Sequence, residues 1–131
     1  MEIQQLYARQ VHLLDAGDAH GWAATFTPDG SFSSPTYGEP VSGPDGLAGI
    51  VRQYRENAGK VGEIWRHITS DLEVGVLDEH TVRVRAHQLI VASAVGEQSR
   101  ISRVVALDDV VTLTEDGWRT RSKTITRDDL A

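Results

Sequence analysis

Cysteine is absent from this chain of 131 residues, and its absence excludes several classes of functional site. Without thiols the chain forms no disulfide, no thiolate nucleophile and no sulfur-ligated metal centre. The five histidines show neither HxH nor HExxH spacing, so no metal site is expected from them. A GxSxG motif, which would mark a nucleophilic serine, is also absent. We therefore expect a protein that works without a metal or another cofactor.

Basic residues and long apolar runs are scarce as well. Thirteen Lys and Arg stand against 19 Asp and Glu, which gives a net charge of -6, and no basic run is present that could follow phosphates. A nucleic-acid partner is therefore not expected. No apolar stretch is long enough to cross a bilayer, and the first residues lack the pattern of a signal peptide. These absences predict a soluble, cytoplasmic protein with no membrane partner.

The first half of the chain carries helical patterns. We predict helices over residues 2–16 and 19–26, the second capped by Asp18, and a third that begins at the GPDG sequence of residues 43–46. The apolar stripe of the first helix consists of Ile3, Leu6, Tyr7, Val11 and Leu14. A turn at Pro28-Asp29-Gly30 leads into a short strand over residues 31–34.

After Gly62 the composition shifts to β-branched residues. Turn signals divide this half into four long strands, which we predict at residues 63–76, 81–95, 99–114 and 118–126. Helices followed by a β-meander indicate an α+β fold, in which a curved antiparallel sheet packs on three N-terminal helices. Strong curvature of such long strands would form a cone with an internal pocket. We expect one domain over residues 1–131.

Asp15 is the most unusual residue of the first helix. It lies on the edge of the apolar stripe, one turn after Val11, and at the helix C-terminus, where the macrodipole disfavours a carboxylate. A carboxylate in such a place needs a partner, and a buried pocket would supply one. The alternative is that Asp15 only bonds the amides of the following helix.

Two histidines are candidate partners for Asp15. Alternation places His67 on one face of its strand with Trp65 and Thr69, which suits a pocket wall, although a partly exposed sheet histidine has the same pattern. His87 shares a face with Arg83 and Arg85, and this face could be solvent, a dimer interface or a pocket rim.

Aromatic residues and one arginine complete the candidate pocket. The aromatic side chains expected around the cone are Tyr7, Trp22, Phe26, Phe32, Tyr54 and Trp65, which would either fill the core or grip a flat ligand. Arg103 interrupts the apolar sequence ISRVVAL. If it points inward, its guanidinium would polarise a carbonyl or hold a carboxylate, whereas an outward side chain would be solvated.

Four segments together resemble one known family. They are LDAGD at residues 14–18, FTPDGSF at 26–32, WRHIT at 65–69 and DGWRTRSKTI at 116–125. Their order is similar to that of the SnoaL-like group of the nuclear transport factor 2-like superfamily, which includes polyketide cyclases, scytalone dehydratase and relatives of ketosteroid isomerase. The resemblance spans essentially the whole chain and implies the cone-shaped fold.

The resemblance also implies roles for residues. In the dehydratase branch an Asp in the place of Asp15 faces a His in the place of His67, and His87 looks similar to a second His that pairs with the Asp. Leu14 and Ser34 stand where or near where scytalone dehydratase has active tyrosines, so scytalone dehydration itself is not implied. The superfamily also contains binding proteins, so the fold alone does not decide the function.

Together these observations favour a cofactor-independent cyclase, isomerase or dehydratase that acts on a hydrophobic, carbonyl-bearing, polyketide-like substrate. Asp15 would be the general base, oriented by one histidine, with the other as acid or oxyanion donor. The alternative is a non-catalytic small-molecule-binding or assembly module with the same cone. We also expect a homodimer through the outer sheet face, because apolar residues occur on both sides of one strand: Val104, Val105, Ala106, Leu107, Val110 and Val111.

Overall fold

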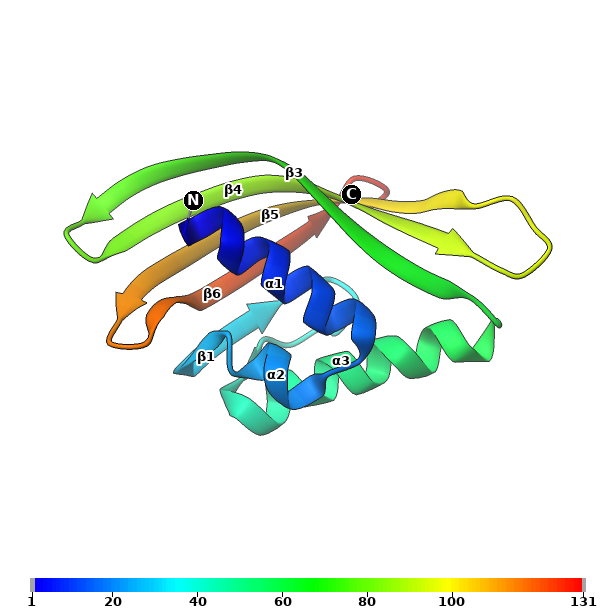
Figure 1. The fold of residues 1–131 in the computed structure, drawn as a ribbon, viewed down its shortest axis with the longest axis horizontal. Coiled ribbons are helices and arrows are strands. Elements are labelled where there is room, and N and C mark those ends of the chain that lie inside the picture. Colours follow the sequence, from blue (N-terminus) through cyan, green and yellow to red (C-terminus); the bar gives the residue numbers. More distant parts are fainter. Residues whose placement is uncertain (1, 131) are drawn as a thin grey trace.

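The computed structural model describes residues 2–130, which form three helices and one six-stranded sheet. In chain order the elements are α1 (Glu2–Ala16), α2 (Ala19–Ala23), β1 (Phe26–Ser33), β2 (Val41–Ser42), α3 (Gly43–Lys60), β3 (Ile64–Asp78), β4 (Thr81–Ser93), β5 (Arg100–Thr114) and β6 (Gly117–Arg127). Figure 1 shows the sheet curving over the helices, so that all three lie on its concave side. The predicted α+β fold, with a curved sheet packed on three helices, is confirmed.

The strand order across the sheet is β2-β1-β6-β5-β4-β3. Strands β3 to β6 form the predicted antiparallel meander, and β1 joins it by pairing in parallel with β6. The sheet does not close on itself, because β2 and β3 remain as its two edges. The sheet is therefore open, and the helices lie against its concave face.

The connection from α2 into the sheet differs from the prediction. Asp18 caps α2 as expected, because its Oδ1 accepts a hydrogen bond from the N–H of Gly21 at 2.8 Å. The helix ends at Ala23 instead of residue 26, because the carbonyl of Thr25 accepts the N–H of Thr120 on β6 at 2.9 Å and so joins the sheet. The predicted turn at residues 28–30 lies within β1, where it appears as a register shift between Phe26 and Ser31.

Two apolar clusters form the core. One joins α2, α3 and β1 and includes Trp22, Phe26, Leu47 and Val51. The other joins α1 to the centre of the sheet through the side chains of Leu6, Tyr7, Val82, Val84, Val105, Leu107 and Val111. Of the apolar residues expected on the two sides of β5, Val105, Leu107 and Val111 are core residues. Alternation along β5 turns them inward and leaves their neighbours Val104, Ala106 and Val110 on the outer face.

Candidate active site

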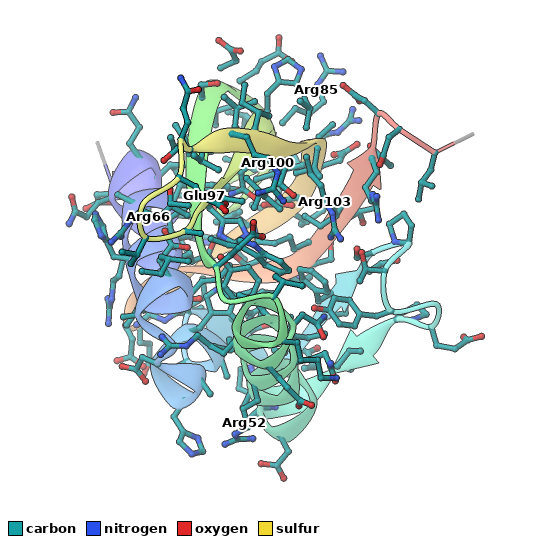
Figure 2. All side chains as sticks on the ribbon, turned by 90° about the vertical axis from the view of Figure 1, so that its right-hand side faces the viewer. Arg52, Arg66, Arg85, Glu97, Arg100 and Arg103 are labelled. Atoms are coloured by element: carbon teal, nitrogen blue, oxygen red, sulfur yellow. The ribbon has the colours of Figure 1, made fainter. Side chains whose placement is uncertain are left out.

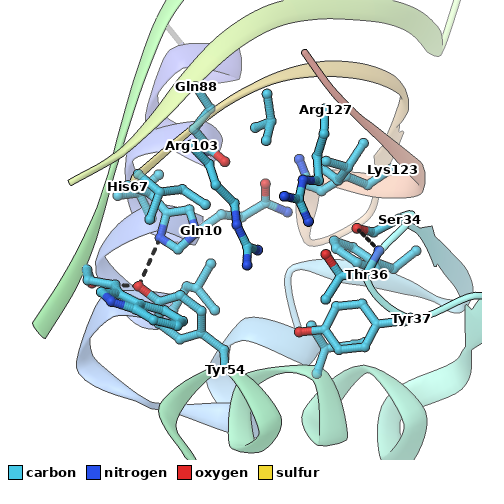
Figure 3. A pocket seen from close by; sticks show the side chains of 18 of the residues that line it. Gln10, Ser34, Thr36, Tyr37, Tyr54, His67, Gln88, Arg103, Lys123 and Arg127 are labelled. Atoms are coloured by element: carbon cyan, nitrogen blue, oxygen red, sulfur yellow. Dashed lines mark hydrogen bonds between the residues drawn. The ribbon is translucent and has the colours of Figure 1, made fainter. Parts of the chain in front are cut away.

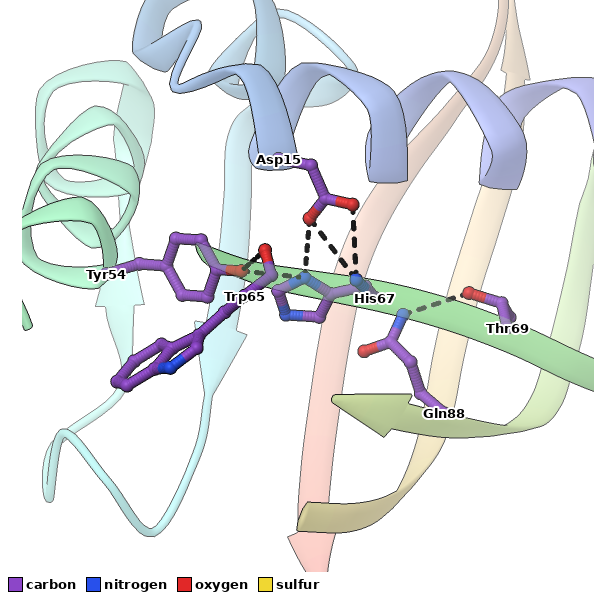
Figure 4. Close-up of polar contacts among 6 residues, drawn as sticks. All are labelled: Asp15, Tyr54, Trp65, His67, Thr69 and Gln88. Atoms are coloured by element: carbon purple, nitrogen blue, oxygen red, sulfur yellow. Dashed lines mark hydrogen bonds and ion pairs between the residues drawn. The ribbon is translucent and has the colours of Figure 1, made fainter. Parts of the chain in front are cut away.

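Asp15 and His67 meet where the last turn of α1 lies against β3 (Figure 4). Asp15 Oδ1 lies 2.8 Å from His67 Nδ1, and Asp15 Oδ2 accepts a hydrogen bond from the backbone N–H of His67 at 3.1 Å. The two side chains are only 10% and 7% exposed, respectively. The C-terminal end of a helix disfavours a carboxylate, and these two donors offset that cost.

The end of α1 positions the carboxylate. Gly17 follows the helix with φ of +75°, a left-handed conformation that glycine adopts without steric cost. A Cβ atom at this position would also lie 2.5 Å from the guanidinium of Arg55 on α3. A substitution of Gly17 would therefore push aside the flexible Arg55 side chain and, because of the positive φ, strain the turn that holds Asp15. Gly17 thus ends α1 one residue after Ala16, where the carboxylate of Asp15 can reach His67 on β3.

Alternation along β3 positions the histidine. His67 is buried, and its flanking residues Arg66 and Ile68 are exposed on the opposite face. Because an ionised carboxylate only accepts hydrogen bonds, Nδ1 of the neutral imidazole carries the proton toward Asp15. The second nitrogen, Nε2, then holds a free electron pair. Within residues 2–130 no hydrogen bond is made to Nε2, which points away from Asp15 in Figure 4.

Tyr54 of α3 completes this cluster. Its hydroxyl donates a hydrogen bond to the carbonyl of Trp65 and lies 3.3 Å from His67 Nδ1, and the rings of Tyr54 and His67 are 4.9 Å apart. Burial, followed by the charge of Asp15, raises the pKa of the Tyr54 phenol. The phenol is therefore protonated at neutral pH and acts as a donor that fixes the backbone next to His67.

A cavity lies between the two core clusters, and His67 forms part of its wall (Figure 3). Its lining comes from α1, α2, α3 and the inner face of the sheet, and most of it is apolar. Asp15 is not part of the lining, because the imidazole of His67 stands between the carboxylate and the cavity. The group that a ligand would meet is thus the imidazole.

The structure brings most of the predicted pocket residues to this cavity. Those in its wall are Tyr7, Trp22, Phe32, Tyr54, Trp65, His67 and Arg103. The prediction that Phe26 lines the pocket is corrected. Phe26 packs against Trp22 with ring centroids 4.8 Å apart and belongs to the core between α2, α3 and β1. Whether the wall residues contact a substrate stays a prediction.

The prediction that His87 belongs to the site is also corrected. Its side chain is 63% exposed and lies 3.0 Å from the carboxylate of Asp71 on the outer face of the sheet, so it reaches neither Asp15 nor the cavity. The physical reason is alternation along β4. Val84 and Ala86 point into the core, which turns His87 outward and its neighbour Gln88 inward. The side-chain amide of Gln88 donates to Thr69 Oγ1 at 3.0 Å in the cavity wall.

Sequence reasoning missed several polar residues of the cavity. They are Gln10, Tyr37, Gln88, Lys123 and Arg127. Alternation could have predicted Gln88 and Lys123. Each lies two residues from an apolar residue that points inward on the same strand, Ile90 and Ile125 respectively. Tyr37 lies outside the helices and strands, so no periodicity predicts its orientation.

A buried polar group forms one end of the cavity. Asp109 is fully buried, and its Oδ2 accepts hydrogen bonds from the Tyr7 hydroxyl and from Lys123 Nζ, the latter at 2.6 Å. Burial and the negative charge of Asp109 raise the pKa of Tyr7, which keeps the phenol protonated as a donor. This group fixes α1 to β5 and β6 beneath the cavity.

Other kinds of site find no support in the described residues. Among residues 2–130 no cluster of three His, Asp or Glu side chains is arranged to hold a metal ion. No helix of the same residues is long and apolar enough to cross a membrane.

The sequence matches the SnoaL-like domain family over residues 1–124. The chain belongs to this family. The predicted resemblance is thereby confirmed, and the curved sheet over three helices is the SnoaL-like fold of this chain. No curated protein matches the sequence.

Solved structures share this SnoaL-like fold over almost the whole chain. ActVI-ORFA from Streptomyces coelicolor superposes with a TM-score of 0.88 at 23% identity, covering 98% of this chain and 97% of its own. Aln2 from a Streptomyces species gives 0.87 at 26% identity, covering 98% and 89%. A protein from Catenulispora acidiphila, solved in complex with S-DNPA, gives 0.81 at 29% identity, covering 98% and 92%.

Proposed function

We propose that this SnoaL-like domain is a cofactor-independent enzyme that transfers protons on a hydrophobic, carbonyl-bearing ring substrate of the polyketide type. The observation that carries the proposal is the pairing of Asp15 with His67 at the wall of an apolar cavity. An imidazole held in one tautomer by a carboxylate transfers protons near neutral pH. Within the proposal, the chain acts as one domain over residues 1–131 in the cytoplasm.

The geometry supports an exchange of the two roles expected from the sequence. His67 is the base, because its Nε2 is the free acceptor at the cavity, and Asp15 is the positioning residue behind it. His67 Nε2 takes a proton from the carbon next to the substrate carbonyl. The electron pair of the C–H bond forms a double bond to the carbonyl carbon, and the π electrons of the carbonyl move to its oxygen, which gives an enolate. The imidazolium then returns the proton to another atom of the substrate.

This proton cycle serves each reaction of the proposed class. Return of the proton to a different carbon isomerises the substrate, and its return to a leaving hydroxyl releases water. Attack of the enolate carbon on a second carbonyl closes a ring, and the proton then goes to the new alkoxide. A small molecule in the fold is supported by the S-DNPA complex of the Catenulispora acidiphila protein. The aromatic wall around His67, which includes Trp22 and Trp65, suits a flat ring system.

Proton abstraction is testable without knowledge of the natural substrate. We would incubate the bicyclic ketone 2-tetralone with the protein in D₂O and follow, by NMR, the replacement of hydrogen by deuterium next to the carbonyl. The wild type should accelerate the exchange, H67Q should abolish the acceleration, and D15N should reduce it strongly. D116N, a change in an exposed turn, is the matched control and should behave as the wild type.

The alternative of a non-catalytic binding module makes the opposite prediction. Exchange at the same rate with wild type and H67Q would contradict the enzymatic proposal and favour a domain that only holds its ligand. The alternative also predicts a cone filled by side chains, with Asp15 bonded only to backbone amides. The side-chain contact between Asp15 and the His67 ring instead supports the proposed dyad.

A further inference from the structure

Three cationic side chains line the cavity, and they differ in their partners. Lys123 is paired with Asp109 at 2.6 Å, and Arg127 forms a two-pronged pair with Asp129 at 2.9 and 2.6 Å. Arg103 also lines the cavity, yet within residues 2–130 it makes no hydrogen bond and no ion pair. In the view of Figure 2, Arg103 lies below Arg85 and above Arg52 of α3. Its guanidinium projects into the cavity in Figure 3.

The cavity carries positive charge in an acidic chain. The chain has 19 Asp and Glu, but none of them lines the cavity. Arg103 is partly buried, which costs free energy because its guanidinium loses water without forming an ion pair within residues 2–130. An apolar residue at this position would avoid that cost. The charge is therefore better explained by a ligand than by the fold.

Alternation along β5 turns Arg103 inward, and a local irregularity of the sheet separates it from Ile101. Along β5 and β4, Arg103 pairs with Ile90 whereas Ile101 pairs with Val91, so Ser102 is an extra residue in β5. Bulges of this kind redirect a side chain and occur next to active sites. Ile101 is 60% exposed on the outer face, while Arg103 shares the inner face with Val105. Without the bulge, Ile101 and Arg103 would share one face.

We infer that the substrate carries a carboxylate, which Arg103 binds through two parallel hydrogen bonds. The inference deepens the proposed function and rests on it for the choice of this cavity as the substrate site. A planar guanidinium matches a carboxylate or a phosphate in this geometry. One unpaired guanidinium offsets a single charge, which favours a carboxylate, because the other two cations are already paired with Asp109 and Asp129.

The sheet sets the distance between this anchor and the proposed base. His67 pairs with Ile90 on β4, and Ile90 pairs with Arg103 on β5, so the three residues form one row across three strands. Two strand spacings separate the Cα atoms of His67 and Arg103 by roughly 10 Å. A flat ring system could therefore extend between them, with its carboxylate at Arg103 and its reacting carbonyl near His67. Arg103 is thus a residue that selects and orients the substrate.

A pair of isosteric probes tests the inference by binding alone. We would measure the affinities of 2-naphthoate and the neutral 2-naphthamide by isothermal titration calorimetry at neutral pH. The wild type should bind the acid roughly 10-fold or more tightly than the amide, as expected for a charge-assisted bidentate contact. R103Q should lose this preference. R121Q, which removes an exposed arginine of β6 outside the cavity, should retain it.

Further variants separate this inference from the proposed function. H67Q should keep the preference for the acid even though it loses proton exchange. R103L should raise the melting temperature, because it removes an unpaired charge from the cavity; this readout also shows that Arg103 is dispensable for folding. Equal affinity of the wild type for acid and amide would overturn the inference, as would a preference that survives in R103Q. Absence of binding of both probes at millimolar concentration would overturn it too. Exchange of 2-tetralone without acid preference would leave the dyad intact and reject the carboxylate anchor alone.

Discussion

The carboxylate of Asp15 and the imidazole of His67 are hydrogen-bonded although 52 positions separate them in the sequence. The last turn of α1 supplies the carboxylate, and the beginning of β3 supplies the imidazole. Because Asp15 also accepts the backbone N–H of the same histidine, one carboxylate holds both the ring and the strand that carries it. Removal of Asp15 should therefore change the tautomer and the orientation of His67 together.

D15N should retain the fold and reduce turnover by at least ~10²-fold, the usual contribution of general acid–base catalysis. The asparagine is nearly isosteric, but its amide no longer requires the proton of the neutral imidazole to lie on Nδ1. The loss should appear in kcat, with little change in KM and melting temperature. H67Q should have an effect of similar size. Steady-state kinetics and thermal unfolding of both variants are the measurements.

The double variant D15N/H67Q checks whether the two residues act as one unit. Its turnover should be little lower than that of the worse single variant, because removal of one member already disables the pair. Additive losses would contradict a dyad and would indicate two independent roles. Normal turnover of D15N on the true substrate would remove Asp15 from the mechanism.

The pH dependence of stability should be linked to Glu63. Hydrogen bonds from Arg100 and Trp65 lower the pKa of the Glu63 carboxyl below the usual 4.5; the Trp65 indole donates at 3.0 Å. A carboxyl whose pKa is lower in the folded state adds stability above its unfolded pKa, and this contribution is lost as pH falls through the folded value. E63Q should therefore lose less stability than the wild type between pH 5 and pH 3.

Urea unfolding at a series of pH values measures this difference. Because the Trp65 indole donates to the Glu63 carboxylate, its fluorescence should report the same titration in the folded wild type and not in E63Q. E39Q removes an exposed carboxylate that has no hydrogen bond within residues 2–130, and it is the matched control. Parallel stability curves for wild type and E63Q would show that Glu63 contributes nothing to the acid response.

Periodicity predicted most of the fold, and the errors occurred where pairing is not local. The long strands β3 to β6 were predicted to within three residues, because β-branched runs and turn residues mark their ends in the sequence itself. The parallel pairing of β1 with β6 has no such local signal. The segment from Thr27 to Gly30 reads as a turn by composition, yet the pairing with β6 draws it into a distorted strand.

The candidate site was predicted less completely, for two physical reasons. The position of Asp15 on the helix marked it as unusual, but its pairing with His67 depended on the family resemblance, since alternation only indicates a face and not which distant residue reaches it. The same resemblance misplaced His87, although the parity of Val84 and Ala86 on its own strand already turned it outward. The parity of Val105 and Leu107 turns Arg103 inward, whereas the outward direction of Ile101 depends on the bulge at Ser102, which is visible only in the register between strands.

The homodimer stays a prediction, and the structure sharpens it. On the outer face Ile68 pairs with Leu89 and Leu89 with Val104, so three apolar side chains form one row across β3, β4 and β5. Ile68 and Val104 are 51% and 38% exposed. Burial of this row between two copies would remove apolar surface from water, and a charge within it would oppose that. V104D should therefore shift light-scattering mass from dimer to monomer.

Val95 provides the control for this experiment. It lies in the turn between β4 and β5, and its side chain is fully exposed and distant in register from the row. V95D should leave the mass unchanged. A wild-type protein that scatters as a monomer at working concentration would reject the dimer outright.

The two neighbouring aspartates of β5 should differ sharply in their contribution to stability. Asp108 points outward, where it pairs with Arg83 at 2.6 Å and both side chains are about half exposed. Asp109 points inward, where it is fully buried and holds Lys123 and Tyr7. Removal of an exposed pair costs about 0–1 kcal/mol, whereas removal of one partner of a buried pair costs about 3–5 kcal/mol.

D109N should therefore lower the free energy of unfolding by several times more than D108N, as measured by urea denaturation at neutral pH. The reason is that D109N leaves the ammonium of Lys123 buried without a counter-charge, whereas D108N leaves Arg83 in contact with water. The double variant D109N/K123M removes both charges, so it should be more stable than D109N alone. Equal losses in D108N and D109N would mean that water reaches Asp109 and that the floor of the cavity is not closed. In that case Lys123 would be free to meet a ligand, and the assignment of Arg103 as the single unpaired cation would need revision.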